Sequence, residues 1–213
     1  MNSKPVIKGL YAITPDCADT QDLLRRTRLV LSGGARVLQY RNKSADAELQ
    51  LSQATVLREL TREFGATFIV NDDAQLAARV NADGVHLGSA DGEMESARAL
   101  LGKHKLIGIS CYNRLPLARS AIAAGADYVA FGAFFPSRVK PDAVAANIDL
   151  LRQARVQFDV PLVAIGGITL SNAVALINEG ADALAVISAL FDAEDCQSTA
   201  QEFCKFFIQD AVS

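Results

Sequence analysis

The sequence contains no tryptophan, and aromatic residues make up only 7% of its 213 residues. Half of the residues are nevertheless hydrophobic, so most of the apolar content is aliphatic. Such a composition is typical of parallel strands covered by helices and less so of antiparallel sandwiches. A chain of this length can build one large hydrophobic core, and we expect a single domain over residues 1–213.

Cysteine and histidine are also scarce. The four cysteines are scattered without a C-x-x-C pair, which predicts reduced thiols in a cytoplasmic protein and argues against a disulfide framework or a zinc site. With only two histidines, His86 and His104, a histidine-based metal site is not expected. His86 lies among apolar residues of a candidate strand, which indicates a hydrogen-bonded core histidine rather than a catalytic one.

Excess positive charge and long apolar runs are absent as well. The net charge of -3 argues against nucleic acid or an anionic membrane as a partner. The start "MNSKPVIKGL" does not resemble a signal peptide, and no run of about eighteen apolar residues predicts a membrane span. A local cluster of cations could still bind a small anion, and a homo-oligomer is compatible with the sequence.

One short pattern recurs along the chain: a helical stretch, a Gly-Ala or Ala-Asp hinge and a β-rich run. It stands as "LSGGARVLQY" (31–40), "RVNADGVHLG" (79–88), "AAGADYVAFGA" (123–133) and "NEGADALAVISA" (178–189). Glycine directly after a helix is a common stop signal. Repetition on this scale indicates one supersecondary unit used several times.

Eight strands are predicted, at 9–14, 36–41, 67–72, 84–88, 106–111, 128–133, 161–167 and 183–188. Helical patterns lie between them, for example at 19–32, 46–64 and 113–124, and 196–210 reads as the eighth helix. Alternating strands and helices predict an α/β fold with a parallel sheet, and eight units predict a single-domain (β/α)8 TIM barrel. The rival, an open doubly wound sheet, lacks its usual glycine-rich phosphate motifs here.

Polar residues at the strand ends are the candidate site, because barrels of this kind carry their chemistry there. Thr14-Pro15-Asp16 after the first strand indicates a loop and a helix cap. The second strand ends in "VLQYRNKS" (37–44), where Gln39, Arg41 and Lys43 share one side of the chain. Two cations on the inward side of a buried strand predict an anion site.

The third and fourth strands end in acids. Asp73 fits a helix cap, which leaves Asn71 and Asp72 open, and Asp91 could likewise cap the following helix. Two acids on adjacent strand ends beside two cations suggest Mg2+ and a phosphorylated substrate, because magnesium prefers oxygen ligands and shares them with phosphates.

The remaining strand ends predict a second anion site. Ser110 and Cys111 at the end of the fifth strand have no His–acid partner that would make either a nucleophile. The loop after the sixth strand is too polar and Pro-rich for a helix and carries Ser137, Arg138 and Lys140. Gly166, Gly167 and Ser188 lie at the ends of the seventh and eighth strands, and this fold usually binds phosphate in the loops that follow. Two anion sites indicate two phosphorylated substrates at one barrel mouth.

Taken together these segments resemble the thiamine phosphate synthase family over nearly the whole chain. The family's motifs stand here, in the family's order, as "QYRNK", "ND", "DGVHLGSAD" and "IGGI". The resemblance implies a Mg2+-dependent transferase that joins 4-amino-2-methyl-5-pyrimidinylmethyl diphosphate to a thiazole phosphate, giving thiamine phosphate and diphosphate. It implies a dissociative reaction, in which diphosphate leaves and the thiazole nitrogen attacks a pyrimidinylmethyl cation.

The resemblance also assigns residues. The pyrimidine diphosphate would contact the stretch Gln39, Tyr40, Arg41, Asn42 and Lys43, together with Asn71, Ser110 and Lys140. The thiazole phosphate would contact Ser137, Arg138, Val139, Gly167, Ile187 and Ser188. Asp72 and Asp91 would hold Mg2+, and Arg41, Lys43, Ser110 and Lys140 would be catalytic.

Two segments depart from the family's pattern. "SRVK" replaces the usual T-x-T-K, so Val139 lacks a hydroxyl, and Ser89 and Ala90 replace the usual Gln and acid before Asp91. Two alternatives stay open: a thiazole tautomerase of the same superfamily, which generally lacks the pyrimidine-diphosphate residues, and a non-catalytic phosphate-binding regulatory barrel.

Overall fold

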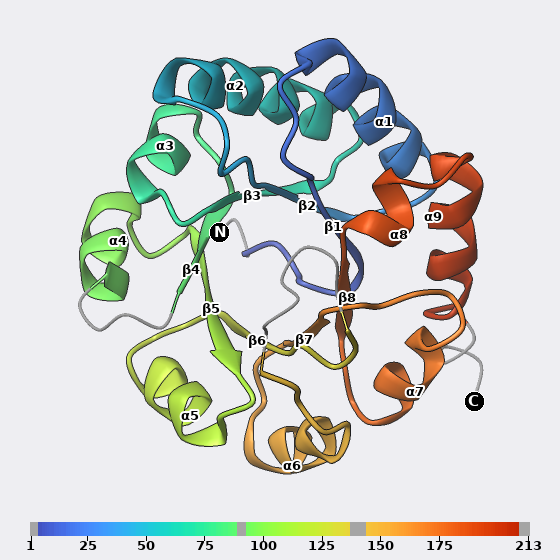
Figure 1. Ribbon diagram of the computed structural model, residues 1–213. Helices are drawn as coiled ribbons and strands as arrows, with labels where there is room; N and C mark the ends of the chain where they lie inside the picture. The colour runs from blue at the N-terminus through green and yellow to red at the C-terminus, as the bar shows by residue number, and fades with distance from the viewer. Residues whose placement is uncertain (1–3, 89–92, 137–143, 209–213) are drawn as a thin grey trace.

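Eight parallel strands form a closed barrel in the order β1 to β8, and β8 pairs with β1 (Figure 1). The computed structural model describes residues 4–88, 93–136 and 144–208. The strands are β1 Gly9–Ile13, β2 Val37–Tyr40, β3 Thr67–Asn71, β4 Gly84–Leu87, β5 Leu106–Tyr112, β6 Tyr128–Phe131, β7 Leu162–Ile165 and β8 Ala183–Val186. All eight predicted strands and the (β/α)8 barrel are therefore confirmed.

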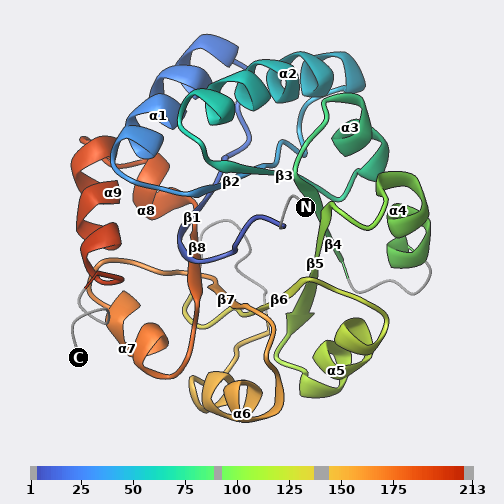
Figure 2. The same cartoon turned by 180° about the vertical axis from the view of Figure 1, so that it is seen from behind.

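The helices surround the barrel, as both end-on views show (Figures 1 and 2). They are α1 Thr20–Ser32, α2 Ala47–Glu63, α3 Ala74–Arg79, α4 Glu93–Leu101, α5 Leu115–Ala123, α6 Asp149–Gln157, α7 Ala173–Asn178, α8 Ser188–Phe191 and α9 Cys196–Lys205. The predicted last helix is α9, which ends at Lys205. The short helix α8 directly after β8 was not predicted.

Aspartates begin several of these helices. The side chains of Asp19, Asp46, Asp73 and Asp195 accept hydrogen bonds from backbone N–H groups in the first turns of α1, α2, α3 and α9. Such caps satisfy donors that the helix itself cannot pair. The predicted cap at Asp73 is confirmed. The prediction that Asp16 caps a helix is wrong, because Asp19 caps α1 and Asp16 contacts residues after β2.

Two apolar layers hold the fold. One lies between the strands and the helices, and the other fills the barrel, where Tyr11, Val37, Ile69 and Tyr128 are fully buried. The Tyr128 ring occupies the space in front of Gly108, where a Cβ atom would lie 2.0 Å from the ring Cζ. A glycine at 108 is thus what allows a tyrosine inside the barrel.

The repeated segments of the sequence correspond to the even-numbered strands. Asp83, Asp127 and Asp182 precede β4, β6 and β8, and each carboxylate accepts from a backbone N–H of the preceding strand. Each aspartate also forms an ion pair with an arginine of the helix that precedes β3, β5 or β7. These arginines are Arg58 of α2, Arg98 of α4 and Arg155 of α6, at 2.7, 2.6 and 2.7 Å. We call these three Arg–Asp pairs the base clamps, because they lie at the amino ends of the strands.

The fourth repeat differs. Exposed Arg36 precedes β2 in the place that the other repeats give to aspartate.

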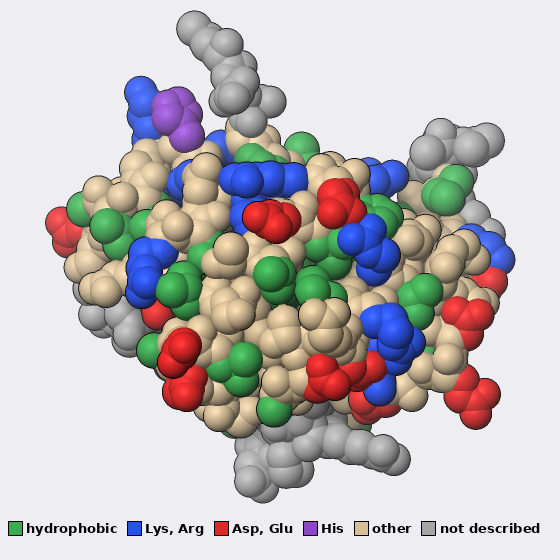
Figure 3. Space-filling view, turned by 90° about the horizontal axis from the view of Figure 1, so that it is seen from above, with side chains coloured by type: hydrophobic (Ala, Val, Ile, Leu, Met, Phe, Trp, Pro, Cys, Tyr) green, Lys and Arg blue, Asp and Glu red, His purple; other side chains and the backbone are tan. Residues whose placement is uncertain are grey.

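Over α1 and α2 the outer surface carries acidic and basic side chains interspersed with scattered apolar ones (Figure 3). In the described part of the chain no helix is both long and apolar enough to span a membrane.

Candidate active site

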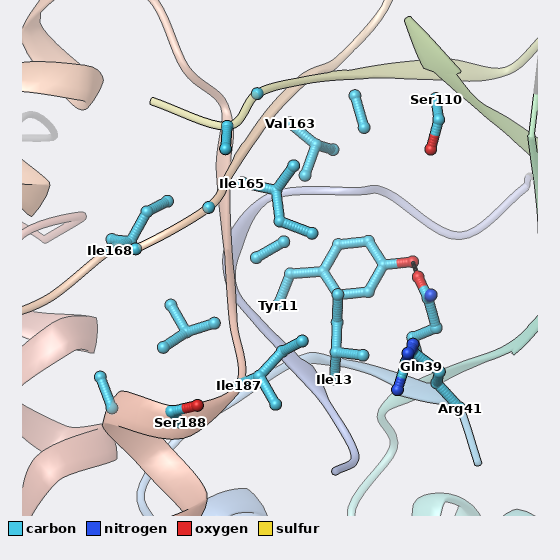
Figure 4. A pocket seen from close by; sticks show the side chains of 18 of the residues that line it. Tyr11, Ile13, Gln39, Arg41, Ser110, Val163, Ile165, Ile168, Ile187 and Ser188 are labelled. Atoms are coloured by element: carbon cyan, nitrogen blue, oxygen red, sulfur yellow. Dashed lines mark hydrogen bonds between the residues drawn. The ribbon is translucent and has the colours of Figure 1, made fainter. Parts of the chain in front are cut away.

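A cavity of about 650 Å³ opens at the carboxyl ends of the strands. Its walls are largely apolar, and small residues such as Ala130 and Ala185 leave the space that larger side chains would fill. Ile13, Val163, Ile165 and Ile187 face it with their side chains (Figure 4). An apolar chamber with few polar groups is the usual form of a small-molecule site.

Polar side chains gather on the side of the cavity formed by β2 to β5. Gln39 is buried, accepts from the Tyr11 hydroxyl at 2.7 Å and donates to the side-chain oxygen Oδ1 of Asn71 at 2.8 Å. Figure 4 shows the Tyr11 hydroxyl directed at Gln39, with Arg41 beside it. Ser110, at the end of β5, completes this side of the cavity. The structure therefore brings together Gln39, Arg41, Asn71 and Ser110.

Arg41 is held from the neighbouring strand end. The Thr14 hydroxyl contacts both the backbone N–H and the carbonyl oxygen of Arg41, at 2.8 and 2.9 Å. Asp16 accepts from the Arg41 guanidinium at 3.0 Å and from the Lys43 backbone N–H at 2.7 Å. The sequence analysis missed this role of Thr14 and Asp16. The available signal was an acid, Asp16, after the first strand and a base, Arg41, after the second, which lies beside it in a parallel barrel.

A second, smaller pocket of about 120 Å³ adjoins the cavity through Arg41 and Asn71, which line both. Lys43 and Asp72 also line it and form an ion pair at 3.1 Å. Asp72 has a positive φ of 61°, which is uncommon for a residue other than glycine and is often found at functional sites. Arg41 and Lys43, which lie two residues apart in the sequence, thus both line this pocket.

Tyr40 and Asn42 line the small pocket too, but their side chains are engaged elsewhere. The Tyr40 hydroxyl donates to Gln53 of α2 at 2.9 Å, and the Asn42 amide donates to Gln53 and to the Cys17 carbonyl oxygen. Burial raises the pKa of Tyr40 above its ordinary value, so its hydroxyl stays protonated. A ligand in this pocket would meet the backbone of these two residues rather than their polar ends.

Asp72 fits a magnesium site by its chemistry. Its half-exposed carboxylate offers hard oxygen ligands beside two cations that suit phosphate. Within residues 4–88, 93–136 and 144–208, no three His, Cys, Asp or Glu side chains form a metal cluster. One or two carboxylates are nevertheless enough for magnesium that is shared with phosphates. Asp91 lies outside the described residues.

The opposite side of the cavity is formed by the ends of β7 and β8. Gly167 has a φ of +62°, and a Cβ atom there would lie 2.3 Å from the Pro136 carbonyl oxygen. The Asn172 amide donates to the Gly167 carbonyl oxygen at 3.0 Å and holds this turn. Ile187 and Ser188 line the same side, where α8 begins. Ser137, Arg138, Val139 and Lys140 lie outside the described residues.

His86 is a hydrogen-bonded histidine, as predicted. Its Nδ1 lies 3.1 Å from the Tyr128 hydroxyl and its Nε2 lies 2.9 Å from Ser110 Oγ. It also lines the cavity, together with Tyr11, which the sequence did not single out. Cys111 is fully buried, and burial raises the pKa of its thiol to about 12, which agrees with the prediction that it is no nucleophile.

Comparison with known proteins identifies the family. The model of the thiamine monophosphate synthase family matches residues 10–190. The chain belongs to this family. It is 54% identical to a thiamine-phosphate synthase of Methylobacillus flagellatus over 97% of this chain and 98% of that one. It is 52% identical to the thiamine-phosphate synthase of Chromobacterium violaceum, over 95% and 98% of the two chains.

Among solved structures, the chain resembles the thiamine phosphate pyrophosphorylase from Pyrococcus furiosus, with a TM-score of 0.84 and 36% identity over 96% of this chain and 97% of that one. The predicted family, fold and activity as a thiamine-phosphate synthase, a transferase, are therefore confirmed. Neither the tautomerase nor the regulatory barrel is favoured by these relatives.

Proposed function

We propose that this protein joins 4-amino-2-methyl-5-pyrimidinylmethyl diphosphate to a 4-methyl-5-(2-phosphoethyl)thiazole, or its carboxylated tautomer, and releases diphosphate and thiamine phosphate. From the carboxylated tautomer, carbon dioxide is released as well. The observation that carries the proposal is the cavity, whose two sides differ in chemistry. One side leads into the pocket with Arg41 and Lys43, and the other ends in the Gly166–Gly167 turn and Ser188. Two different anionic ligands fit these two ends.

We assign the diphosphate to the small pocket. Arg41 can bind two phosphate oxygens with its planar guanidinium, and Lys43 adds a compact charge. The carbon–oxygen bond breaks as negative charge builds up on the departing diphosphate, so these cations stabilise the transition state more than the ground state. Asp16 and Thr14 fix Arg41 before the ligand arrives, which limits the reorganisation that binding requires.

Asp72, with Asp91 in the same role, would hold Mg2+ beside that diphosphate. Magnesium bound there would supply positive charge to the phosphate oxygens. The Lys43 ammonium lies 3.1 Å from the Asp72 carboxylate, in the small pocket to which we assign the diphosphate. It can therefore pass from Asp72 to a phosphate oxygen when the ligand binds.

The reacting carbon would lie between the two ends, above the cavity floor. The apolar walls keep water away from a pyrimidinylmethyl cation, which water would otherwise capture. Gly167, Ile187 and Ser188 would hold the phosphate group of the thiazole substrate. The thiazole ring nitrogen would then be the nucleophile that attacks the pyrimidinylmethyl cation. Positioning of the partner and stabilisation of the leaving group are then the main catalytic effects.

The test is product formation from the two purified substrates with and without magnesium. We expect thiamine phosphate and diphosphate in equal amounts, dependent on the metal. Isomerised thiazole without coupling would indicate the tautomerase, and binding without turnover would indicate the regulatory barrel.

Asp72→Ala provides the matching variant. We expect loss of magnesium-dependent turnover in a folded protein, because the carboxylate that holds the metal is removed. Asp73→Asn is the control, since asparagine also caps α3 and the change removes one neighbouring charge. It should lose much less activity than Asp72→Ala. Full turnover of Asp72→Ala at limiting magnesium would contradict the assignment.

A further inference from the structure

Six side chains form one continuous chain of hydrogen bonds across the cavity floor. They come from β5, β4, β6, β1, β2 and β3, and in order they are Ser110, His86, Tyr128, Tyr11, Gln39 and Asn71. The five links measure 2.9, 3.1, 2.9, 2.7 and 2.8 Å in the same order. We call this set the floor chain. Its two ends lie on β3 and β5, on either side of β4.

The floor chain has a definite direction at its Gln39 end. The Gln39 amide nitrogen donates to Asn71, so the Gln39 carbonyl oxygen must accept from Tyr11. A phenol has one proton, so the Tyr11 oxygen can only accept from its next partner, Tyr128. Burial raises the pKa of both phenols above the ordinary value, which keeps each proton in place.

The same reasoning continues to the other end. The Tyr128 proton is used toward Tyr11, so Tyr128 must accept from the Nδ1–H of His86. A neutral imidazole with its proton on Nδ1 has an acceptor at Nε2. In this form of His86, Nε2 lies 2.9 Å from Ser110 Oγ and accepts the proton of the Ser110 hydroxyl. Every proton of the floor chain is then directed from Ser110 toward Asn71.

We infer that Tyr11, His86 and Tyr128 are positioning residues that set what the two ends of the floor chain present to a ligand. Ser110 has donated its proton to His86, so toward the cavity its oxygen can only accept. The side-chain oxygen of Asn71 accepts from Gln39, so the side-chain NH2 group of Asn71 remains to donate. The cavity thus presents an acceptor at β5 and a donor at β3.

This inference rests on the proposed function, and it explains how the cavity distinguishes its pyrimidine substrate from a close analogue. An exocyclic amino group on a pyrimidine is a donor and matches Ser110, whereas the 4-oxo analogue presents a carbonyl oxygen and does not. The donor at Asn71 matches an anionic diphosphate. A site built around a substrate donor rejects an analogue that lacks it, because buried polar groups are left unpaired. The floor chain therefore selects aminopyrimidines over oxopyrimidines.

The experiment compares the dissociation constants of two unreactive ligands by calorimetry. They are the 4-amino-2-methyl-5-pyrimidinylmethyl diphosphate and its 4-oxo counterpart, each with a methylene group in place of the ester oxygen. In the wild-type protein the amino ligand should bind more tightly. In Tyr128→Phe, which keeps the ring beside Gly108, the preference should fall about tenfold, the effect of one lost hydrogen bond.

Four further variants separate positioning from packing. Tyr11→Phe breaks the next link and should act like Tyr128→Phe, which also covers failure of either variant to fold. A glutamine side chain can both donate and accept hydrogen bonds, so His86→Gln should keep more of the preference for the amino ligand than His86→Phe. Thr61→Val removes a buried hydroxyl that donates within α2, far from the floor chain, and should leave the preference unchanged.

The outcomes are distinct. If the tyrosine variants weaken both ligands by the same factor, the floor chain is only structural and the inference is overturned. If the wild-type protein prefers the oxo ligand, Ser110 donates toward the ligand, the Nε2 atom of His86 carries a proton, and the inference is overturned. Failure of the proposed function would be seen separately, as absence of thiamine phosphate in the wild-type assay.

Discussion

Arg41 illustrates what can be predicted for a single residue. Alternation along the second strand places Gln39 and Arg41 toward the barrel interior, and the structure confirms both at the cavity. The partner of Arg41 could not be predicted, because Asp16 lies 25 residues away and meets it only through the pairing of β1 with β2. The floor chain was missed for the same reason, since each tyrosine by itself fits an apolar core.

Arg41→Ala should lower the turnover number about a hundredfold, as loss of one oxyanion donor does in other enzymes. The reason is that charge on the diphosphate increases as the carbon–oxygen bond breaks. Steady-state kinetics at saturating concentrations of both substrates measure this effect.

Arg119→Ala is the matched control for that variant. Arg119 lies on α5 and contacts Gln157 on the protein surface, so its removal should leave turnover unchanged. If Arg41→Ala also keeps normal turnover, the two cations after β2 do not hold the diphosphate.

At the scale of elements, strands were more predictable than short helices. β-rich runs bounded by turn signals identified all eight strands. Helix α8 escaped prediction because its four residues, "SALF", are too few to show a helical period. The loop after β7 was predicted from two glycines, but the reason for Gly167 is visible only in the fold, where the β6 loop passes against it.

Gly167→Val should raise the Michaelis constant for the thiazole phosphate about tenfold or more, equivalent to roughly 1.4 kcal/mol of binding. The added side chain must displace the backbone at Pro136 and strains a turn with positive φ. The constant for the pyrimidine diphosphate should change much less. Initial rates with each substrate varied in turn give both values.

Gly125→Val separates strain from site effects. Gly125 also has a positive φ, +98°, but no atom lies within 4 Å of the Cβ position, and the residue precedes β6 at the far end of the barrel. This variant should lose stability and keep both Michaelis constants. Equal changes in both constants for Gly167→Val would indicate general damage to the barrel.

For the whole molecule, the repeated Ala-Asp pattern predicted a repeated unit but not what the aspartates do. Their arginine partners lie 25 to 29 residues earlier on helices, so the base clamps depend on how each helix crosses the sheet. Asp83 is the clearest case, since it accepts from both terminal guanidinium nitrogens of Arg58 and from the Phe68 backbone N–H.

Asp83→Ala should lower the free energy of unfolding by about 2 kcal/mol, because it leaves Arg58 and a backbone donor unpaired in a partly buried position. Urea unfolding measures the change. Activity below the transition should be normal, since the clamp and the cavity lie at opposite ends of the barrel.

Glu63→Ala tests an ion pair without burial. Glu63 pairs with Arg28 at 2.7 Å, with both side chains about half exposed, and such pairs contribute less than about 1 kcal/mol. If Glu63→Ala lowers the free energy of unfolding as much as Asp83→Ala does, the Arg58–Asp83 base clamp contributes no more than an exposed ion pair.

Closure of the barrel also determines how the chain can fold while it is being synthesised. Gly9 of β1 pairs with Ala183 of β8, so the first strand has a neighbour on one side only until the eighth has left the ribosome. An unpaired strand edge is open to association with other chains. Contacts between residues so distant along the chain also form slowly. The nascent protein must therefore keep the edge of β1 from other strands for most of its synthesis, and ring closure comes late.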